Sequence, residues 1–462
     1  MEVRNLKNLR TLLSSLVVPI LLSLIACNTL TPNQTTDLEP GETTTLSQEI
    51  QDPTQKLAGK ILALSSASES PTAVIDLGEE DDLQDGENVP KMMLIGSGNN
   101  TPMDAGPDVE PEAVNPLTGQ PVEDPTLLSL PPALVSISNF PASARPQAGL
   151  NASPITYEIA IGEGMTRFLS IFYGDFPEAV DEEMDNPSNQ NANPVSETAA
   201  IGPIRSGRLP YEDLRATYSG FLVMASAWKG VSQNLNSANS VYGSEDDDIN
   251  SAMVTTEKLF DLAESQSETF AGSNFNLEGM RFSSTPPAGG KDADTIWVFY
   301  SALNQIQWQY DENLQAYIRY DIKTDGSGEF VMATDRLTGE PVAKENVIVL
   351  YAEHKYIAPT LIDIDLMNKP STKALLFRNG KVYDIFWTSQ FGDYEKETGR
   401  LRPIRFVDVS GEPIAQKPGQ TWIQVVSMSS YHVESAPSEQ PFYPVIEENE
   451  TGLWLIRYRG KY

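Results

Sequence analysis

Apolar and polar residues alternate along the chain from about residue 133 onward, and this pattern predicts a series of β-strands. ALVSISNF at 133–140 is an apolar strand, and ITYEIAI at 155–161 alternates as a strand with one buried face would. The turn residues GEG at 162–164 lead into MTRFLSIFYG, which is apolar enough on both faces to be a central strand. These two segments are therefore expected to form a β-hairpin.

The next part of the chain predicts helices between strands. Pro210 suits the first position of a helix, and YEDLRATYSGF places acids in the first turn, where the helix dipole favours them. FLVMASA at 221–227 reads as a buried strand, and TEKLFDLAES at 256–265 as a second helix. The polar, proline-interrupted residues 177–199 predict an exposed loop. The strand–helix–strand order indicates a mixed α/β domain over residues 115–275.

The second half, residues 276–462, predicts a mainly β domain with a final strand at GLWLIRYR. Its expected strands include DTIWVFY, QIQWQY, AYIRYDIK, NVIVLYAE, KALLFRNGKVYDIFWT and TWIQVVSM. Asn379-Gly380 and Asp325-Gly326 are turn pairs that connect some of them. The expected fold class is therefore α+β, a mixed α/β N-terminal domain followed by a mainly β C-terminal domain.

The N-terminus has the pattern of a secretory signal peptide over residues 1–27. Three basic residues precede a short apolar run from Thr11 to Ile25, which is too short and wrongly flanked for a lasting transmembrane helix. The run ends in LIAC, which resembles the bacterial lipobox, and Cys27 is the single cysteine of the chain. The alternative, a buried thiol in a signal-anchor helix, does not explain the small residue before Cys27 or the polar ones after it. We expect a diacylglyceryl group on Cys27 that anchors the protein to the membrane on its extracytoplasmic face.

Residues 28–114 have the composition of a disordered acidic linker. They carry seventeen acids against three lysines, a net charge of −14, and are rich in Thr, Ser, Pro and Gly. Such a segment cannot bury enough apolar surface to offset its ordering entropy. As a flexible chain it would reach roughly 50 Å. Its expected role is to space the folded part from the membrane.

Charge and composition then narrow the classes of function. The chain has 462 residues and a net charge of −32, so its long-range field repels nucleic acid, and no nucleic-acid partner is expected. Lipidation would consume the only thiol, which excludes disulfides and cysteine catalysis. His354 and His432 are the only histidines and neither accompanies a nucleophile motif, while the acids SEDDD at 244–248 read as a solvated loop more readily than as a calcium site. No metal and no cofactor is expected.

Several ordered motifs resemble one protein family. PLTGQPV, NFPASARPQAGL, ITYEIAIGEGMTRFLSIF and IGPIRSGR resemble the N-terminal domain of the DUF3048 family of YerB-like bacterial lipoproteins, and DRLTGEPVAKENVIVLYAE and ALLFRNGKVYDIFWT resemble its C-terminal domain. The resemblance runs from about residue 115 to 426 and implies a surface lipoprotein of the cell envelope without a settled activity. After Phe221 this chain has MASAWKGVS where members of the family generally have a Gly-rich, often His-containing stretch.

Arginines supply the main candidate site. Arg145 follows a strand, Arg167 opens one, and Arg205 and Arg208 precede the predicted helix at Pro210. Because ligand sites gather at the ends of such elements, we expect these four side chains in one concave region, with Glu158 and Glu163 at its margin. Guanidinium groups there would bind carboxylate or phosphate. An internal network that pairs Arg205 or Arg208 with Glu158, Glu163 or Glu212 explains the same residues.

Two functions are open at this point. The leading one is a noncatalytic extracytoplasmic binding or scaffold lipoprotein that uses the arginines for an anionic ligand or an envelope protein partner. The alternative is a hydrolase acting on envelope glycan, with Glu158 and Glu163 as its catalytic carboxylates. Two convergent acids in an open cleft would favour the enzyme, whereas acids paired with arginine would favour binding.

Overall fold

The structure is a computed structural model, and it describes residues 113–177, 199–243, 248, 250–269, 277–438 and 450–460. All of them lie in one compact unit, Ile95–Tyr462. The predicted signal peptide with Cys27, nearly all of the predicted linker, the interior of the predicted loop at 177–199 and most of the acids at 244–248 lie outside the described residues.

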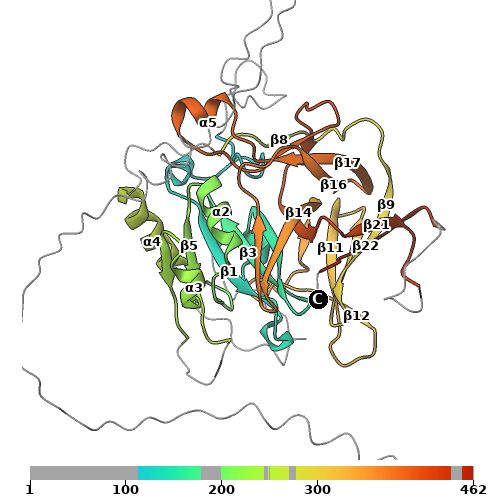
Figure 1. The fold of residues 1–462 in the computed structure, drawn as a ribbon, viewed down its shortest axis with the longest axis horizontal. Helices are drawn as coiled ribbons and strands as arrows, with labels where there is room; N and C mark the ends of the chain where they lie inside the picture. The colour runs from blue at the N-terminus through green and yellow to red at the C-terminus, as the bar shows by residue number, and fades with distance from the viewer. Residues whose placement is uncertain are drawn as a thin grey trace, which may run out of the picture. The chain divides into compact units, whose positions relative to one another are not determined.

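A long mixed sheet runs through both halves of the described chain (Figure 1). Its strands pair in the order β6 (Ala238–Ser240), β5 (Phe221–Met224), β1 (Ala133–Ser138), β3 (Met165–Phe172), β2 (Ile155–Gly162), β20 (Thr421–Ser427), β14 (Asn346–Ala358), β16 (Thr372–Arg378), β17 (Lys381–Thr388) and β18 (Arg405–Val407). Two groups are parallel, β6–β5–β1 and β2–β20–β14, and the other neighbours are antiparallel. The predicted hairpin is β2–β3.

Further strands cover one face of this sheet. Their order is β12 (Phe330–Met332) and β13 (Ala343–Lys344) on β11 (Ala316–Ile322), then β10 (Asn304–Asp311), β9 (Lys291–Ser301), β22 (Gly452–Arg457) and β21 (Tyr431–Glu434). The shorter pairs are β14 with β15 (Leu361–Asp365), β4 (Ala200–Ile201) with β7 (Val254–Thr255), and β8 (Arg281–Phe282) with β19 (Ala415–Gln416). The core lies between the two layers, where Trp308 of β10 meets Trp422 of β20 edge to face at 5.4 Å between ring centroids.

Helices are few, and those labelled in Figure 1 beside β1 and β5 come from the first half of the chain. They are α2 (Pro210–Thr217), α3 (Lys229–Ser232) and α4 (Thr256–Thr269), with α5 (Asp393–Thr398) in the second half and 3-10 turns at η1 (Pro125–Ser129), η2 (Ala142–Ala144) and η3 (Leu150–Ala152). α2 begins at Pro210 as predicted. Tyr218, which ends it, shares a 2.9 Å hydrogen bond with the hydroxyl of Tyr157 in β2.

The described residues are thus mostly β-sheet with a few helices. The prediction that the strand at 155–161 has only one buried face is wrong, because every residue of β2 is buried. α2 packs over one face of the hairpin at Tyr157, and the second layer of strands packs over the other at Glu158. The strands of both halves share one sheet through β2 and β20; the domain boundary near residue 275 stays a prediction.

Candidate functional site

The segment between β4 and α2 inserts between β1 and β5 where these parallel strands end. The N–H of Arg205 donates to the carbonyl of Ser136 at 2.8 Å, and the N–H of Ala225 donates to the carbonyl of Arg205 at 3.0 Å. Gly207 is held to Ser226 in the same way at 2.8 Å. Arg205 and Arg208 are therefore fixed at the carboxyl ends of two parallel strands, the edge of a sheet at which ligands commonly bind.

Three of the predicted arginines come together on the face of the sheet that α2 covers. Arg167 is only 7% exposed, and its Nη1 donates to the carbonyl of Ser206 at 2.8 Å. Arg205 Nε donates to Ser138 Oγ at 3.0 Å. Burial, together with the charges of Arg208 and Arg205, lowers the pKa of Arg167 to about 10 against the opposing effect of Tyr211. Three like charges are therefore held within electrostatic reach of one another.

Each of these guanidinium groups also keeps a buried donor without a partner. The donors are Arg167 Nε, Arg205 Nη2 and Arg208 Nε. A buried donor that makes no hydrogen bond costs about 1–3 kcal/mol, and more when it is charged. Within the described part of the chain none of the three arginines makes an ion pair, although Asp248 is close enough to oppose the lowering of the Arg205 pKa by burial. This arrangement is complementary to an anion.

The carboxylate that was expected among these arginines lies on the opposite face of the sheet. Glu158 is 0% exposed, and its Oε2 accepts from Arg319 Nη1 at 2.7 Å and from Trp422 Nε1 at 3.2 Å. Its Oε1 accepts from Thr166 Oγ1 at 2.7 Å and from Asn139 Nδ2 at 3.4 Å. The carboxylate of Glu158 thus has all its described partners inside the protein.

Arg319 is the centre of this buried network. Its Nη2 lies 2.9 Å from Asp321 Oδ1, and the guanidinium carbon is 4.7 Å from the ring centroid of Trp422. Burial alone would lower the pKa of Arg319, but the charges of Asp321 and Glu158 raise it above its usual range. Burial would likewise raise the pKa of Asp321, which the charges of Arg319 and Arg145 hold below its ordinary value. The network joins β2 of the first half to β11 of the second.

The expected four-arginine site is therefore divided by the sheet. Arg145 donates to Asn139 Oδ1 at 2.9 and 3.1 Å and lies 3.9 Å from Asp321, so it belongs with Glu158 and Arg319. Ser138 and Asn139 are consecutive residues, and consecutive side chains of an extended segment point to opposite faces. Arg145 is thus separated from the Arg167, Arg205 and Arg208 cluster.

The expected internal ion pairs of Arg205 and Arg208 are not the ones that form. Glu158 pairs with Arg319, and Glu212 pairs with Arg215 at 2.7 Å. Glu163 is exposed at the turn between β2 and β3, with a φ of 52°. Glu158 and Glu163, the two acids of the hydrolase hypothesis, therefore occupy unlike environments, one in the interior and one at a turn.

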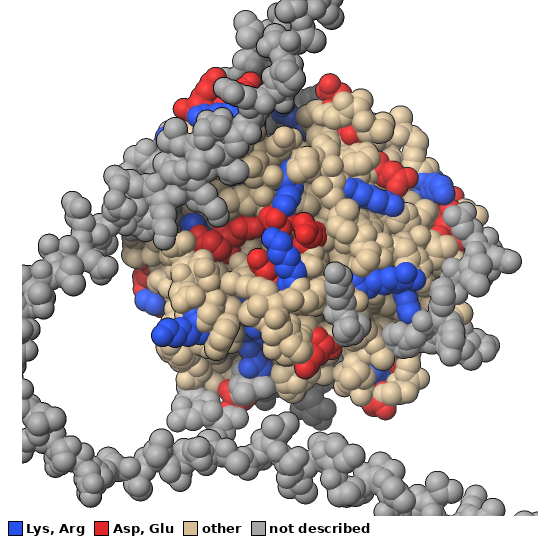
Figure 2. All heavy atoms as spheres, viewed as in Figure 1, with Lys and Arg blue, Asp and Glu red and all other residues tan. Residues whose placement is uncertain are grey.

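Acidic side chains gather instead where α2 meets β15. Figure 2 shows acidic groups with basic ones beside them at the centre of the face it draws, over the region where Figure 1 places α2. Asp213 Oδ2 accepts from the N–H of Leu366 at 3.0 Å, and burial, with the charges of Asp365 and Asp363, raises the pKa of Asp213 to about 6. Lys369 pairs with Asp365. This mixed cluster is self-neutralising in part and offers no set of unpaired donors.

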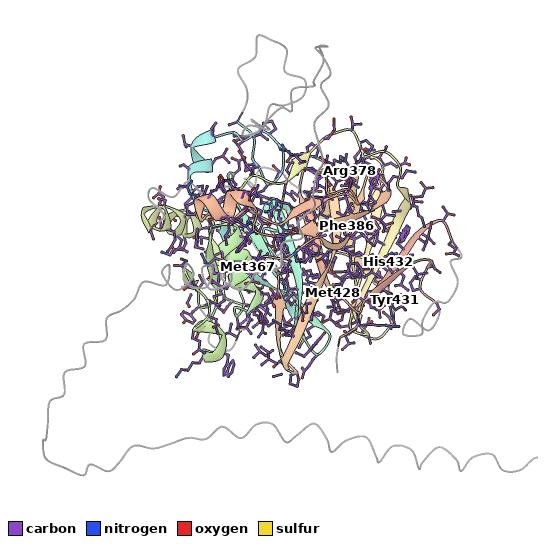
Figure 3. All side chains as sticks on the ribbon, turned by 45° about the horizontal axis from the view of Figure 1, so that its top comes forward. Met367, Arg378, Phe386, Met428, Tyr431 and His432 are labelled. Carbon is purple, nitrogen blue, oxygen red and sulfur yellow. The ribbon has the colours of Figure 1, made fainter. Side chains whose placement is uncertain are left out.

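The two histidines have ordinary structural surroundings. His432 Nδ1 lies 2.9 Å from the Tyr351 hydroxyl, and burial lowers the pKa of His432, as it does that of His354, to about 4. Figure 3 shows His432 beside Tyr431 and apart from Arg378. Arg378 is fully buried and donates to backbone carbonyls such as that of Ala415 at 3.1 Å. These contacts join separate segments of the second half of the chain.

In the described part of the chain, no group of three or more His, Cys, Asp or Glu side chains is placed to hold a metal ion. Among the same residues no helix is long and apolar enough to cross a membrane. An open groove of about 750 Å³ lies beside β8, β17 and β19, with Lys291, Asp384 and Asp408 in its lining.

Arg319 and its partners were missed from the sequence, although a signal for them exists. In AYIRYDIK the buried positions of β11 include Tyr317, Arg319 and Asp321, which share one face of the strand. Opposite charges two residues apart on the buried face of a strand indicate an internal ion pair, because isolated buried charges are too costly. Their partner Glu158 could not be found in this way, since it lies 161 positions away.

Family models, a sequence relative and a solved structure all match this chain and point to the same family. The model of the DUF3048 N-terminal domain, a protein of unknown function, matches residues 117–266, and that of the DUF3048 C-terminal domain matches residues 296–423. The Bacillus subtilis (strain 168) protein named "Putative lipoprotein YerB" is 28% identical over 339 residues, which cover 70% of this chain and 89% of that protein. The crystal structure of YerB from Bacillus subtilis matches with a TM-score of 0.50 at 24% identity, over 68% of this chain and 97% of that one, and so shares its fold. The chain belongs to the DUF3048 family.

Proposed function

We propose that the protein is a noncatalytic, lipid-anchored binding protein of the extracytoplasmic membrane face, whose ligand carries an anionic group bound by Arg167, Arg205 and Arg208. One observation carries this proposal: three neighbouring guanidinium groups each retain a buried donor without a partner. An anion that reached them would satisfy these donors and neutralise the repulsion that, in addition to burial, lowers the pKa of Arg167.

The chemistry of the cluster favours phosphate, sulfate or carboxylate groups. Guanidinium groups offer paired N–H donors that match such oxygens, and they stay charged at any physiological pH. The start of α2 at Pro210 lies two residues beyond Arg208, so the positive end of the helix dipole adds to the same field. In this proposal the anion is bound and not transformed.

The anchor and the finer architecture are part of the proposal. Cys27 carries the lipid, residues 28–114 form the tether, and residues 115–275 form a mixed α/β domain before a mainly β domain at 276–462. The name of the Bacillus subtilis relative supports the lipid anchor. No observation favours the glycan hydrolase, because Glu158 is wholly buried against Arg319 and Glu163 lies at an exposed turn.

Anion binding by the soluble protein tests the proposal. Calorimetric titration and thermal melts with inorganic phosphate and with sulfate should show binding and an increase in melting temperature. Arg205→Ala should weaken binding roughly 10- to 100-fold, which corresponds to the loss of a charge-assisted hydrogen bond of about 1.5–3 kcal/mol. Without anion the melting temperature of this variant should stay the same or rise, since a like charge is removed.

The matched control is Arg215→Ala, because Arg215 lies on α2 but is already paired with Glu212. This control should bind phosphate as the unaltered protein does. If Arg205→Ala lowers the melting temperature markedly and the unaltered protein responds to neither anion, the arginines have an internal structural role and the proposal is wrong.

A further inference from the structure

Two large aromatic side chains are exposed at the same edge of the sheet as the three arginines. Trp228 is 68% exposed and follows β5, and Tyr242 is 73% exposed and follows β6. Because β1, β5 and β6 are parallel, their carboxyl ends share one edge. Both rings therefore extend the edge at which the 203–208 segment holds its arginines.

Backbone contacts place Trp228 next to the arginine segment. Gly207 donates its N–H to Ser226, two residues before Trp228, and a Cβ at Gly207 would lie 3.7 Å from the Cβ of Ala227. Arg208 directly follows Gly207, and Trp228 directly follows Ala227, so both residues continue from this contact. The backbone at Trp228 therefore lies beside the backbone of the arginine segment.

The ring of Trp228 is held in its exposed position by a glycine. A Cβ at Gly230 would overlap the Cζ3 and Cη2 atoms of this ring, so the ring lies directly against the backbone of α3. The Cε3, Cζ3 and Cη2 atoms of the indole lie against Gly230, and the residue as a whole is 68% exposed. Of the other described tryptophans, those at 308, 387, 422 and 454 are at most 5% exposed and Trp297 is half-buried, so Trp228 is the most exposed of them.

We infer that the ligand of this site is an anionic saccharide, a sugar that bears a phosphate or carboxylate group; this inference rests on the proposed function. The anionic group binds Arg167, Arg205 and Arg208, and the sugar ring packs one C–H face on Trp228. An amphipathic ring suits an exposed indole, because its C–H face is apolar while its hydroxyls stay in water. Aromatic rings that lie largely in solvent enclose a nucleobase poorly, and the net charge of −32 opposes a nucleic-acid polyanion.

Calorimetric titration with four probes tests the inference: N-acetylglucosamine 1-phosphate, N-acetylglucosamine, adenosine monophosphate and inorganic phosphate. The sugar phosphate should bind at least about tenfold more tightly than phosphate alone. Trp228→Ala should remove this advantage and leave phosphate binding unchanged. Gly230→Ala should have the same selective effect, since it displaces the ring without altering any arginine. Tryptophan emission should respond to the sugar phosphate in the unaltered protein but not in Trp228→Ala.

Val409→Ala is the control, because Val409 is an 87% exposed apolar residue of the second half and should affect no probe. Phosphate binding without any preference for the sugar phosphate would overturn this inference and leave the proposed function standing. Tighter binding of adenosine monophosphate than of the sugar phosphate would also overturn it, in favour of a nucleotide. If phosphate itself does not bind, the proposed function fails first and the inference fails with it.

Discussion

Replacement of Arg319 by Met should destabilise the protein severely. This arginine is 1% exposed and lies between Glu158, which is 0% exposed, and Asp321, which is 5% exposed. A methionine fills much of the same space, but it leaves two buried carboxylates without their central cation. Arg145 compensates little, because its Nη1 is 3.9 Å from Asp321 and it makes no bond to Glu158.

The expected loss in free energy of unfolding follows from this geometry. Removal of one partner from a buried ion pair costs about 3–5 kcal/mol, since the charge that remains is neither solvated nor paired. Glu158→Gln should cost less, because Arg319 keeps Asp321 at 2.9 Å. In the double variant Arg319→Met, Glu158→Gln the two effects should not add, and a coupling free energy of about 1–3 kcal/mol is expected.

Urea unfolding followed by tryptophan emission is a suitable assay, because Trp308 and Trp422 both face the Arg319 guanidinium. The control is Lys323→Met, which breaks an ion pair with Glu329 whose side chains are 36% and 59% exposed. Such a surface pair is worth about 0–1 kcal/mol and weakens with salt, whereas the Arg319 effect should persist at high salt.

The pH dependence provides a second check. The pKa of Asp321 is lowered in the folded protein, so its contribution to stability is present above the unfolded value near 3.9 and is lost as the pH falls through the folded value. In Arg319→Met the carboxylate of Asp321 takes up a proton more readily, because the cation that lowers its pKa is gone. The difference in free energy of unfolding between the unaltered protein and the variant should therefore be largest near pH 7 and should decrease toward pH 4. A loss below about 1 kcal/mol at pH 7, or strict additivity with Glu158→Gln, would refute this account of the network.

Three other predictions concern separate parts of the chain. Asp213→Asn should raise the melting temperature by a few degrees at pH 7.5, by less at pH 5 and hardly at all below about pH 4, because the pKa of Asp213 is raised to about 6 and the penalty for its ionisation builds up between the unfolded value near 3.9 and this folded value. Gly162→Ala should lower the free energy of unfolding, measured by chemical denaturation, by at least about 2 kcal/mol, since Gly162 has a φ of 111° and a Cβ there would overlap the carbonyl oxygen of Pro359. The control is Gly326→Ala, which should lower it by only about 1 kcal/mol, because Gly326 has a φ of 81° but open space around it. Cys27→Ala should abolish metabolic labelling with a fatty-acid analogue, and retained label would contradict lipidation at this residue.

Local sequence patterns predicted the strands with continuous apolar runs but not their neighbours. β1, β2, β3, β14, β16 and β20 each follow from an apolar segment bounded by turn residues. β15 has the sequence LIDID, in which acids occupy two of the half-buried positions and weaken the apolar signal. The parallel pairing of β2 with β20 joins Ile155 to Thr421, and no short-range pattern specifies so distant a partner.

The candidate site was predictable only where it depends on local sequence. IGPIRSGR places Arg205 and Arg208 just before a helix, and both do lie at the carboxyl end of the parallel strands. The separation of Arg145 from them depends on Asp321, which comes from the other half of the chain. Likewise, Glu158 is buried by the second layer of strands, and no feature of ITYEIAI predicts that layer.

The insertion of β20 between β2 and β14 has an evolutionary consequence. One of the matched segments contains β2, and the other contains β14 and the first three residues of β20, so neither segment can complete the sheet by itself. Recombination that exchanged one segment between relatives would have to preserve the β2–β20 register and the Glu158–Arg319 pair at the same time. We therefore expect the two segments to be inherited together and to accumulate compensating substitutions across the 161 positions that separate these two residues.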